Sequence, residues 1–129
     1  KASEIAMFES VRKELTKLQR SFSTIKHSNH RGIVLDGRDI GTVVFPNAKF
    51  KFFLDAEIRI RAERRTEELI HLNYKVIYHE VLEDLIIRDE RDKNRKIAPL
   101  RKAKDAIFID TSLKSEEKVL QEALDFINN

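Results

Sequence analysis

The stretch of sequence that decides the fold, residues 33–55, reads IVLDGRDIGTVVFPNAKFKFFLD. It opens and closes with short apolar runs, and each run ends in an aspartate, Asp36 and Asp55. A third apolar run of this kind ends at Asp110. Short apolar runs bounded by polar residues are typical of buried strands. We therefore expect three strands, at residues 33–36, 50–54 and 106–109.

Helical patterns lie between these runs and on either side of them. Apolar residues recur at spacings of three and four over residues 3–22, where Ser3 can cap an amphipathic helix. Asp55 is a suitable N-cap for an Arg- and Glu-rich helix, and Ser115 precedes an acidic first turn. The expected helices cover residues 3–22, about 57–70, about 76–92 and the stretch after Ser115. Strands that alternate with helices predict parallel βαβ units in an α/β layered domain.

Composition limits the chemistry that the chain can carry. Its 129 residues hold 25 Lys and Arg against 22 Asp and Glu, a formal charge of +3, and no Cys. A thiol nucleophile, a disulfide and a Cys-based zinc site are therefore excluded. No apolar stretch approaches the ~20 residues that a membrane span needs, and no signal-peptide pattern opens the sequence. We expect a cytoplasmic protein without a membrane partner.

The four histidines do not form a metal-binding pattern. His27 and His30 stand three apart in a polar stretch without a nearby carboxylate, and His71 and His79 are isolated. Transition-metal sites need several ligands brought together at defined spacing. We expect no transition metal held by the protein.

The first candidate site is the segment DGRDIGTVVFP, residues 36–46. In open α/β sheets ligands bind at the carboxyl ends of the strands, so Asp36 can lie near a nucleotide-bound magnesium ion. The planar fork of Arg38 matches phosphate oxygens. The alternative is a polar turn in which Arg38 and Asp39 form a surface salt bridge, worth about 0–1 kcal/mol. Spacing alone leaves both interpretations open.

The second candidate site is the segment RDERDKNRKIAPL, residues 88–100. One face of a helix there would present three guanidinium groups and a carboxylate, from Arg88, Arg91, Asp92 and Arg95. This set suits a ligand with a phosphate at one end and hydroxyl groups at the other. By pattern alone, a solvated helix with intrahelical ion pairs, each worth a few tenths of a kcal/mol, is the commoner case.

The third candidate is the Arg-rich helix near residues 57–70, in which glutamates alternate with four arginines, Arg59, Arg61, Arg64 and Arg65. A mobile helix of this kind can close over a nucleotide, exclude water and neutralise the charge of a transferring phosphate. A charged face toward solvent is the commoner role of such a composition.

Taken together, these segments resemble bacterial cytidylate kinases. The resemblance rests on three motifs, DGRDIGTVVFP at 36–46, FKFFLDA at 50–56 and RDERDKNRKIAPL at 88–100. Two further stretches support it, SEIAMFESVR at 3–12 and DAIFIDT at 105–111. The resemblance covers nearly the whole chain in the family's order. It implies a three-layer α/β fold of the phosphate-loop nucleoside monophosphate kinase type, with a parallel sheet that is incomplete at the N-terminus.

The resemblance also implies a division of the chain. Residues 1–31 correspond to the end of the CMP-binding insertion and a return helix, residues 57–75 to the lid region, and the remainder to the core of one domain. The family's phosphate loop, G-x-x-x-x-G-K-[ST], has no counterpart here, and the first residue is Lys1 rather than Met. We therefore expect a further segment that supplies this loop and a central strand. Residues 1–129 alone are expected to be inactive.

Roles on the acceptor side follow from the resemblance. Ser3, Arg12 and Asp39 match positions that contact cytosine, whose N3, O2 and exocyclic amine suit a mixture of donors and an acceptor. Arg38 and Arg95 match the arginines that hold the α-phosphate of the acceptor.

The resemblance implies further roles around the sugar and the transferred phosphate. Arg88 and Asp92 match positions near the sugar hydroxyl groups. Arg64 and Arg65 fall in the lid, near the ATP phosphates, and Arg91 faces the transferring phosphate. The implied catalytic residues are Asp36, Arg38, Arg91 and Arg95, with Asp36 acting near Mg²⁺ through water rather than as a direct metal ligand.

The implied activity is ATP-dependent phosphorylation of CMP and dCMP to CDP and dCDP. A phosphate oxygen of CMP attacks the γ-phosphorus of ATP in line, and the expected cofactor is Mg²⁺ with ATP. The expected partners are ATP and CMP or dCMP, with no nucleic acid, and the expected state is a monomer.

Two alternatives to this function stay open. The first is a small basic nucleic-acid-binding module, because the sequence pI is 9.2 and residues 88–104 hold eight Lys and Arg against three acidic residues. The aromatic residues are mostly Phe in apolar runs, however, not interleaved with the basic patch as base stacking requires. The second alternative is a kinase of another nucleoside monophosphate, UMP or AMP.

Overall fold

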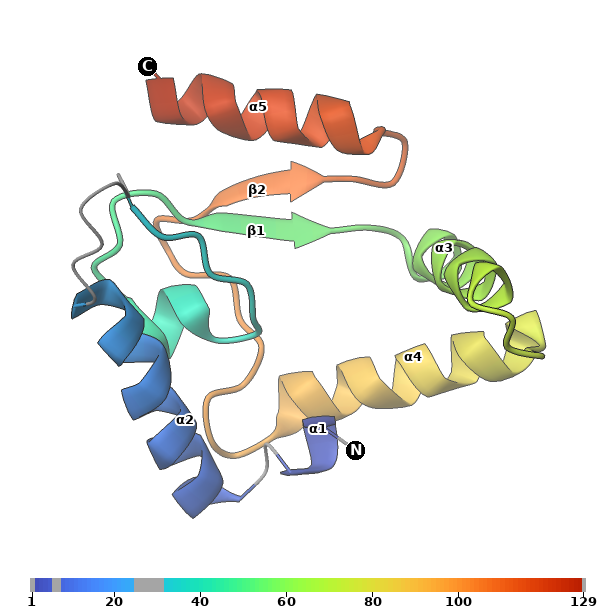
Figure 1. Ribbon diagram of the computed structural model, residues 1–129, viewed down its shortest axis with the longest axis horizontal. Coiled ribbons are helices and arrows are strands. Elements are labelled where there is room, and N and C mark those ends of the chain that lie inside the picture. Colours follow the sequence, from blue (N-terminus) through green and yellow to red (C-terminus); the bar gives the residue numbers. More distant parts are fainter. Residues whose placement is uncertain (1, 6–7, 25–31, 129) are drawn as a thin grey trace. The chain divides into compact units, whose positions relative to one another are not determined.

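The computed structural model describes residues 2–5, 8–24 and 32–128 (Figure 1). These residues fall into two units, each with its own set of contacts, which we describe separately. The N-terminal unit consists of Lys1–Lys49 and Arg91–Lys104, and the sheet unit of Phe50–Glu90 and Asp105–Asn129. In the part of the chain that the structure describes, no helix is long and apolar enough to cross a bilayer.

The helices and strands are divided between the units in chain order. The N-terminal unit contains α1 (Ala2–Ile5), α2 (Glu9–Ser21), the 3₁₀ turn η1 (Phe22–Thr24) and the π-helical turn η2 (Ile40–Val44). The sheet unit contains β1 (Phe52–Asp55), α3 (Ile58–His71), β2 (Ile107–Asp110) and α5 (Glu116–Asn128). Helix α4 (Tyr78–Asn94) begins in the sheet unit, and its last residues belong to the N-terminal unit.

Strands β1 and β2 pair in parallel. Their register places Asp55 opposite Asp110, and the Thr111 N–H extends the ladder by donating to the Asp55 carbonyl over 2.8 Å. Because the strands are parallel, both aspartates lie at the same end of the sheet. This end is where open α/β sheets bind ligands.

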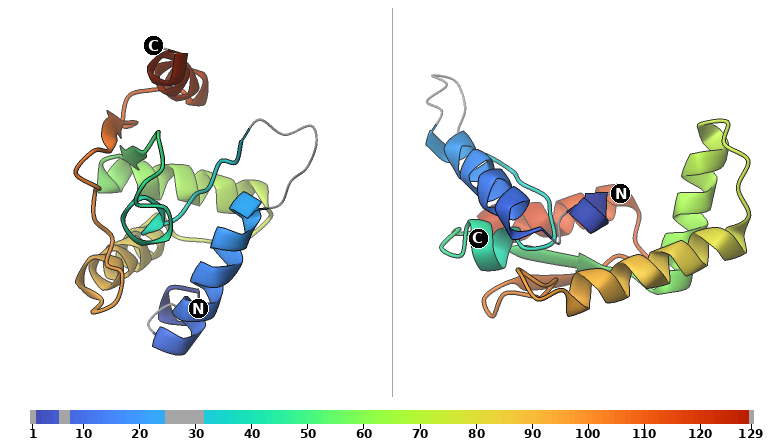
Figure 2. Two further views of the ribbon diagram at one scale, coloured as in Figure 1. Left: turned by 90° about the vertical axis from the view of Figure 1, so that its left-hand side faces the viewer. Right: turned by 90° about the horizontal axis from the view of Figure 1, so that it is seen from below.

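Apolar side chains give the sheet unit a small core. Ile109 on β2 and Ala62 on α3 have no exposed surface. Helix α5 runs beside the two strands (Figures 1 and 2), and the ring centroid of its Phe126 lies 6.5 Å from that of Phe52. The apolar stripe of α5 therefore helps to cover the strands, as the helical spacing of its apolar residues predicts.

An ion pair lies where the two strands begin. Lys51 Nζ lies 2.5 Å from Asp105 Oδ2, and the Lys51 side chain is only 6% exposed. The hydrogen bond from Lys51 lowers the pKa of Asp105 below its ordinary value. A depressed carboxyl pKa stabilises the fold at pH values above the unfolded pKa, and this stabilisation is lost as the pH falls through the folded pKa.

In the N-terminal unit, α2 packs against η2. The turn is closed by N–H groups of Val43 and Val44, which donate to the Asp39 carbonyl over 2.8 and 3.2 Å. The Arg20 guanidinium of α2 donates to the carbonyls at the other end of the turn, to Val44 over 3.0 Å and to Val43 over 2.8 Å. Val44 itself is 2% exposed.

Two of the three expected strands are confirmed. They lie at 52–55 and 107–110, so each is shifted toward the aspartate that closes it. The expected strand at 33–36 is wrong, because no strand forms there and Val34 is fully exposed. A strand needs a neighbour with unpaired backbone groups. Within the described residues, β1 and β2 pair only with each other.

Three of the expected helices are confirmed as α3, α4 and α5. At the start of α5, the Ser115 hydroxyl accepts a hydrogen bond of 3.4 Å from the Lys118 N–H, as an N-cap does. The expected single helix at 3–22 is wrong, because extended backbone at Phe8 separates α1 from α2. The expected N-cap at Asp55 is also wrong, because Asp55 ends β1 and its carboxylate accepts the neighbouring Ala56 N–H over 2.9 Å.

The buried position of Ile109 leads to a stability prediction. Ile109→Ala removes a fully buried side chain, and we expect the free energy of unfolding to fall by about 2–5 kcal/mol, because the cavity cannot close completely. Leu113→Ala, at a side chain that is 94% exposed, is the control and should change it by less than about 0.5 kcal/mol. Urea denaturation followed by circular dichroism measures both, and equal effects would contradict the assignment of Ile109 to the core.

Candidate functional site

A cluster of arginines and aspartates lies in the N-terminal unit. We call it the Arg95 cluster, and its members are Arg12, Arg38, Asp39, Asp92 and Arg95. Arg12 contacts Asp39 in an ion pair with a hydrogen bond, and Arg38 Nε donates to Asp92 Oδ2 over 3.1 Å. The Arg95 guanidinium lies 3.9 Å from Asp39 Oδ1 and 3.8 Å from Asp92 Oδ1. Arg95 is therefore placed between the two carboxylates.

Three members of the Arg95 cluster are buried, while Arg38 is exposed, and the cluster contains more guanidiniums than carboxylates. The side chains of Arg95 and Asp92 are 4% and 3% exposed, and that of Asp39 is 9% exposed. Three guanidinium groups face two carboxylates. Burial, and next the nearby positive charge of Arg12, lower the pKa of Arg95 below its ordinary value. An additional anion would therefore be favoured here on charge grounds.

Arg95 retains hydrogen-bonding capacity inside the cluster. Its Nη2 atom is buried and has no hydrogen-bond partner within the described residues. Leaving a buried charged donor unsatisfied is unfavourable by more than the ~1–3 kcal/mol typical of neutral groups. An oxygen atom of a bound ligand would satisfy it.

The turn after α4 fixes the direction of Arg95. Its Nε atom donates to the Ala98 carbonyl over 2.7 Å, and Ala98 has a left-handed backbone with φ of 49°. The Leu100 N–H donates to the Asp92 carbonyl, also over 2.7 Å. These bonds fold the chain back on the end of α4, so that the guanidinium points toward the carboxylates.

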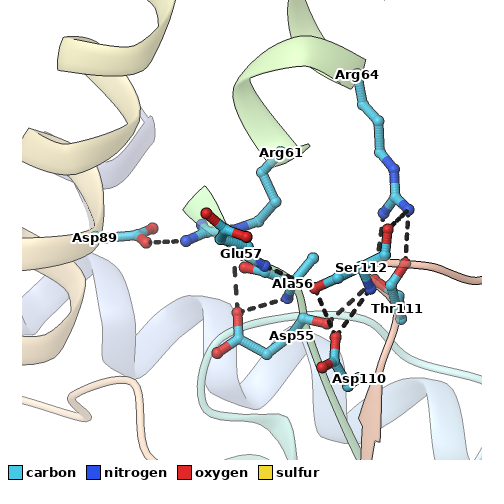
Figure 3. A network of polar contacts seen from close by, with 9 residues as sticks. All are labelled: Asp55, Ala56, Glu57, Arg61, Arg64, Asp89, Asp110, Thr111 and Ser112. Carbon is cyan, nitrogen blue, oxygen red and sulfur yellow. Dashed lines mark hydrogen bonds and ion pairs between the residues drawn. The ribbon is translucent and has the colours of Figure 1, made fainter. Parts of the chain in front are cut away.

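A second polar network lies in the sheet unit, at the carboxyl ends of β1 and β2 (Figure 3). Arg61 on α3 reaches Asp89 on α4, with 2.8 Å between Nη2 and Oδ2, and it donates from Nε to the Ala56 carbonyl over 2.9 Å. Its Nε also lies 3.9 Å from the Asp55 carboxylate. Arg61 thereby connects the start of α3 to α4 and to the end of β1.

The residues after β2 complete this network. The Ser112 N–H and hydroxyl both donate to Asp110 Oδ1, over 2.9 and 2.7 Å, and lower the pKa of Asp110 below its ordinary value. The Ser112 hydroxyl also accepts the Glu57 N–H at the start of α3, over 2.9 Å. Arg64 Nη2 donates to the Thr111 carbonyl over 2.6 Å (Figure 3).

The structure brings together five of the residues named from the sequence, those of the Arg95 cluster. The contacts differ from a surface salt bridge between Arg38 and Asp39, but they include an ion pair between residues three apart, Asp92 and Arg95, as the second alternative expects. Arg38 pairs with Asp92 rather than with its neighbour Asp39, and Asp92 and Arg95 are buried rather than solvated.

Of the other residues named from the sequence, Arg91 and Asp36 belong to the N-terminal unit. Arg91 is half-buried, 3.9 Å from Glu4, while Arg88 is exposed and belongs to the sheet unit. Asp36 is exposed. The Ser3 side chain, like His27 and His30, lies outside the described residues.

Arg64 and Arg65, which the resemblance assigns to a lid, have local partners in the sheet unit. Arg64 contacts the residues after β2, and Arg65 Nη1 lies 2.6 Å from the carboxylate of Glu68, one turn along α3. Both arginines are exposed, so neither contact removes them from solvent.

Sequence reasoning missed the contact of Arg20 with η2, and it did not predict that Arg61, one of the arginines of the third candidate, pairs with Asp89. Arg20 is one of several cations on the polar side of α2, and its two carbonyl partners carry no signal in the sequence. Arg61 and Asp89 lie on different helices, 28 positions apart, so no local spacing relates them. Their contacts could only be found in three dimensions.

The comparisons with known proteins decide the family. A family profile described as Cytidylate kinase matches residues 1–129. The chain belongs to the cytidylate kinase family. Its short parallel sheet with flanking helices is accordingly an α/β fold of the nucleoside monophosphate kinase type.

Individual cytidylate kinases agree with this family assignment. The cytidylate kinase of Pasteurella multocida is 44% identical over 126 residues, which cover 98% of this chain and 53% of that protein. That of Vibrio vulnificus is 43% identical over 128 residues, 99% of this chain and 54% of that protein. That of Thermosipho melanesiensis is 46% identical over 123 residues, which cover 95% of this chain and 54% of that protein. The chain thus spans about half the length of the curated relatives it matches.

The burial of Asp92 predicts a large effect of its removal on stability. In Asp92→Ala, Arg38 and Arg95 lose a carboxylate partner, and we expect unfolding free energy to fall by about 3 kcal/mol. Asp84→Ala, at an exposed position of the same helix, is the control and should shift it by less than about 0.5 kcal/mol. A fall of the same small size in both variants, measured by urea denaturation, would show that the buried pairs do not stabilise the cluster.

The contact between Ser112 and Asp110 predicts a pKa change. Ser112→Ala removes the hydroxyl donor but keeps the N–H donor, so the pKa of Asp110 should rise toward its ordinary value without reaching it. The acid-sensitive stabilisation from Asp110, present above the unfolded pKa, should shrink accordingly. Carboxyl ¹³C chemical shifts measured against pH report the change. Asp105, whose pKa depends on Lys51, is the internal control and should not move.

Proposed function

We propose that the complete enzyme containing this chain transfers a phosphoryl group from ATP to CMP and dCMP, forming CDP and dCDP. The observation that carries the proposal is the Arg95 cluster. In this group of three guanidiniums and two carboxylates, Arg95, Asp39 and Asp92 are buried, and Arg95 has an unsatisfied donor. Such a group is suited to a ligand that combines phosphate with neutral hydrogen-bonding groups. Membership of the cytidylate kinase family supports the choice of reaction.

In this proposal Arg38 and Arg95 bind the α-phosphate of the acceptor. Arg38 is 42% exposed, so its fork is accessible from solvent, whereas Arg95 offers its buried Nη2. Asp92 lies between them and fixes both guanidiniums through its two oxygens. Two positioned cations would orient the attacking phosphate oxygen and offset its charge.

Arg12 and Asp39 would recognise the base. Cytosine offers acceptors at N3 and O2 and a donor at its exocyclic amine, which match a guanidinium beside a carboxylate. The ion pair between Arg12 and Asp39 keeps both side chains in place before the ligand arrives. Ser3 is proposed as a third base contact, and Arg88 and Asp92 as contacts to the sugar.

The lid arginines Arg64 and Arg65 are proposed to bind ATP phosphates. Arg64 donates to the hydroxyl and carbonyl of Thr111 and to the Ser112 carbonyl, and Arg65 pairs with the neighbouring Glu68, all at the surface. Exposed contacts of this kind contribute little stability and are readily exchanged for a phosphate. Closure of α3 would exclude water from the transferring group. Arg91 is proposed to face the same group.

Magnesium is proposed to enter with ATP rather than through a site of the protein. No group of three or more metal-ligating side chains occurs within the described residues. Asp36, an exposed carboxylate two residues before Arg38, would orient water near the ion. When bound with ATP, Mg²⁺ supplies charge neutralisation at the donor phosphates.

The proposal is tested by Arg38→Ala in the complete enzyme. We expect kcat/KM for CMP to fall by about 10²-fold, because a charge-assisted contact to the acceptor phosphate is lost. Arg101→Ala, at an exposed arginine of the same unit, is the control and should leave kcat/KM within about twofold. Release of ADP, coupled to pyruvate kinase and lactate dehydrogenase, measures the rate with CMP, dCMP, UMP and AMP.

Three outcomes would contradict the proposal. An unchanged kcat/KM in Arg38→Ala would remove Arg38 from the acceptor site. A preference for UMP or AMP would retain the reaction and reject cytosine as the base. Tight, salt-sensitive RNA binding without CMP-dependent ADP release would favour the nucleic-acid-binding alternative. Residues 1–129 alone, which contain no phosphate-loop motif, should release no ADP in this assay.

A further inference from the structure

Helix α2 holds residues 39–44, which comprise Asp39 and the turn η2, at two points. Near its start, Arg12 pairs with the carboxylate of Asp39. Near its end, Arg20 donates to the carbonyls of Val43 and Val44. Arg12 and Arg20 are eight residues apart, which corresponds to about 12 Å along a helix. One rigid helix therefore contacts both ends of η2.

The contact made by Arg20 satisfies groups that the turn leaves open. Carbonyls at the C-terminal end of a helical turn have no partner inside the turn, and a cation is favourable there. The Arg20 fork reaches two adjacent carbonyls at 2.8 and 3.0 Å, a geometry that a lysine ammonium reproduces only in part. Since π-helical turns are rare and poorly stabilised by themselves, such an external contact has a clear effect on whether the turn persists.

The position of Asp39 depends on this turn. Its carbonyl accepts the N–H groups of Val43 and Val44, and its side chain, 9% exposed, lies between Arg12 and the more distant Arg95. A shift of η2 along α2 would move the Asp39 carboxylate away from Arg12. Asp39 and Arg12, with Thr16 and Gln19, also line a small cavity on this side of α2.

We propose that Arg20 is a positioning residue for base selection. It fixes η2 against α2 and thereby holds the Asp39 carboxylate where it distinguishes the amine of cytosine from the carbonyl of uracil. Arg20 does not touch the nucleotide. This inference rests on the proposed function, because Asp39 selects a base only if the acceptor is a pyrimidine nucleotide.

The structural part of the inference is tested without nucleotide. In Arg20→Met, hydrogen exchange at the amides of Val43, Val44 and Phe45 should accelerate about tenfold, since the turn loses its external partner. Lys17→Met, which removes an exposed cation one turn earlier on the same helix, is the control and should leave these amides unchanged. Arg20→Lys should give an intermediate rate. Unchanged exchange in Arg20→Met would overturn the inference.

The functional part is tested by steady-state kinetics with CMP and UMP in the complete enzyme. In Arg20→Met we expect KM for CMP to rise about tenfold, the preference for CMP over UMP to fall by a similar factor, and kcat to stay within about threefold. Lys17→Met should behave as the unchanged protein. A merely structural role would reduce the active fraction, and so kcat, and would leave the preference between CMP and UMP intact.

A double-mutant cycle decides whether Arg20 acts through Asp39. In an Asp39→Ala background, Arg20→Met should have no further effect on the ratio of CMP to UMP use, because the residue that it positions is gone. Full additivity of the two changes would overturn the inference. If the unchanged complete enzyme does not use CMP at all, the proposed function fails, and with it the role in base selection; hydrogen exchange then still decides whether Arg20 fixes the turn.

Discussion

The N-terminal unit depends on the burial of one cation, the guanidinium of Arg95. Removing such a group from water is unfavourable unless carboxylates and hydrogen bonds compensate for the lost hydration. Asp39 and Asp92 provide this compensation from segments far apart in the sequence, and the Ala98 carbonyl provides a hydrogen bond. The turn before η2 and the end of α4 are therefore fixed by the same charge.

The polar network of the sheet unit is built on a different principle. Arg64, Thr111 and Ser112 interact through hydrogen bonds near the surface, where water competes and each contact contributes little. Arg61 is the exception, because it is partly buried and bonds both to Asp89 and to the Ala56 carbonyl. The partly buried contacts of Arg61 thus fix the start of α3, while the arginines farther along the helix make solvent-exposed contacts.

The sequence predicts most helices and strands well, but it does not predict which strands pair or which side chains contact each other. The helices α3, α4 and α5 and the strands β1 and β2 follow from periodicity and from the aspartates that end the apolar runs. A strand at 33–36 does not form, because a strand depends on its neighbour and an apolar run such as Ile33–Leu35 says nothing of what lies beside it. The arginines and aspartates of the Arg95 cluster were expected, but the pairing of Arg38 with Asp92 rather than with the adjacent Asp39 depends on tertiary packing alone.

The imbalance of charge in the Arg95 cluster is most simply explained by a ligand. If only folding mattered, a cluster of two arginines and two aspartates would be more stable than one of three arginines and two aspartates. A well-packed apolar side chain would likewise stabilise the fold more than a buried Nη2 atom without an acceptor. A site that must bind a phosphate faces the opposite requirement, because a balanced cluster would have no attraction left for an anion. In the proposed function, an acceptor phosphate would complete both the charge and the hydrogen bonds of the cluster, and its binding would stabilise the N-terminal unit.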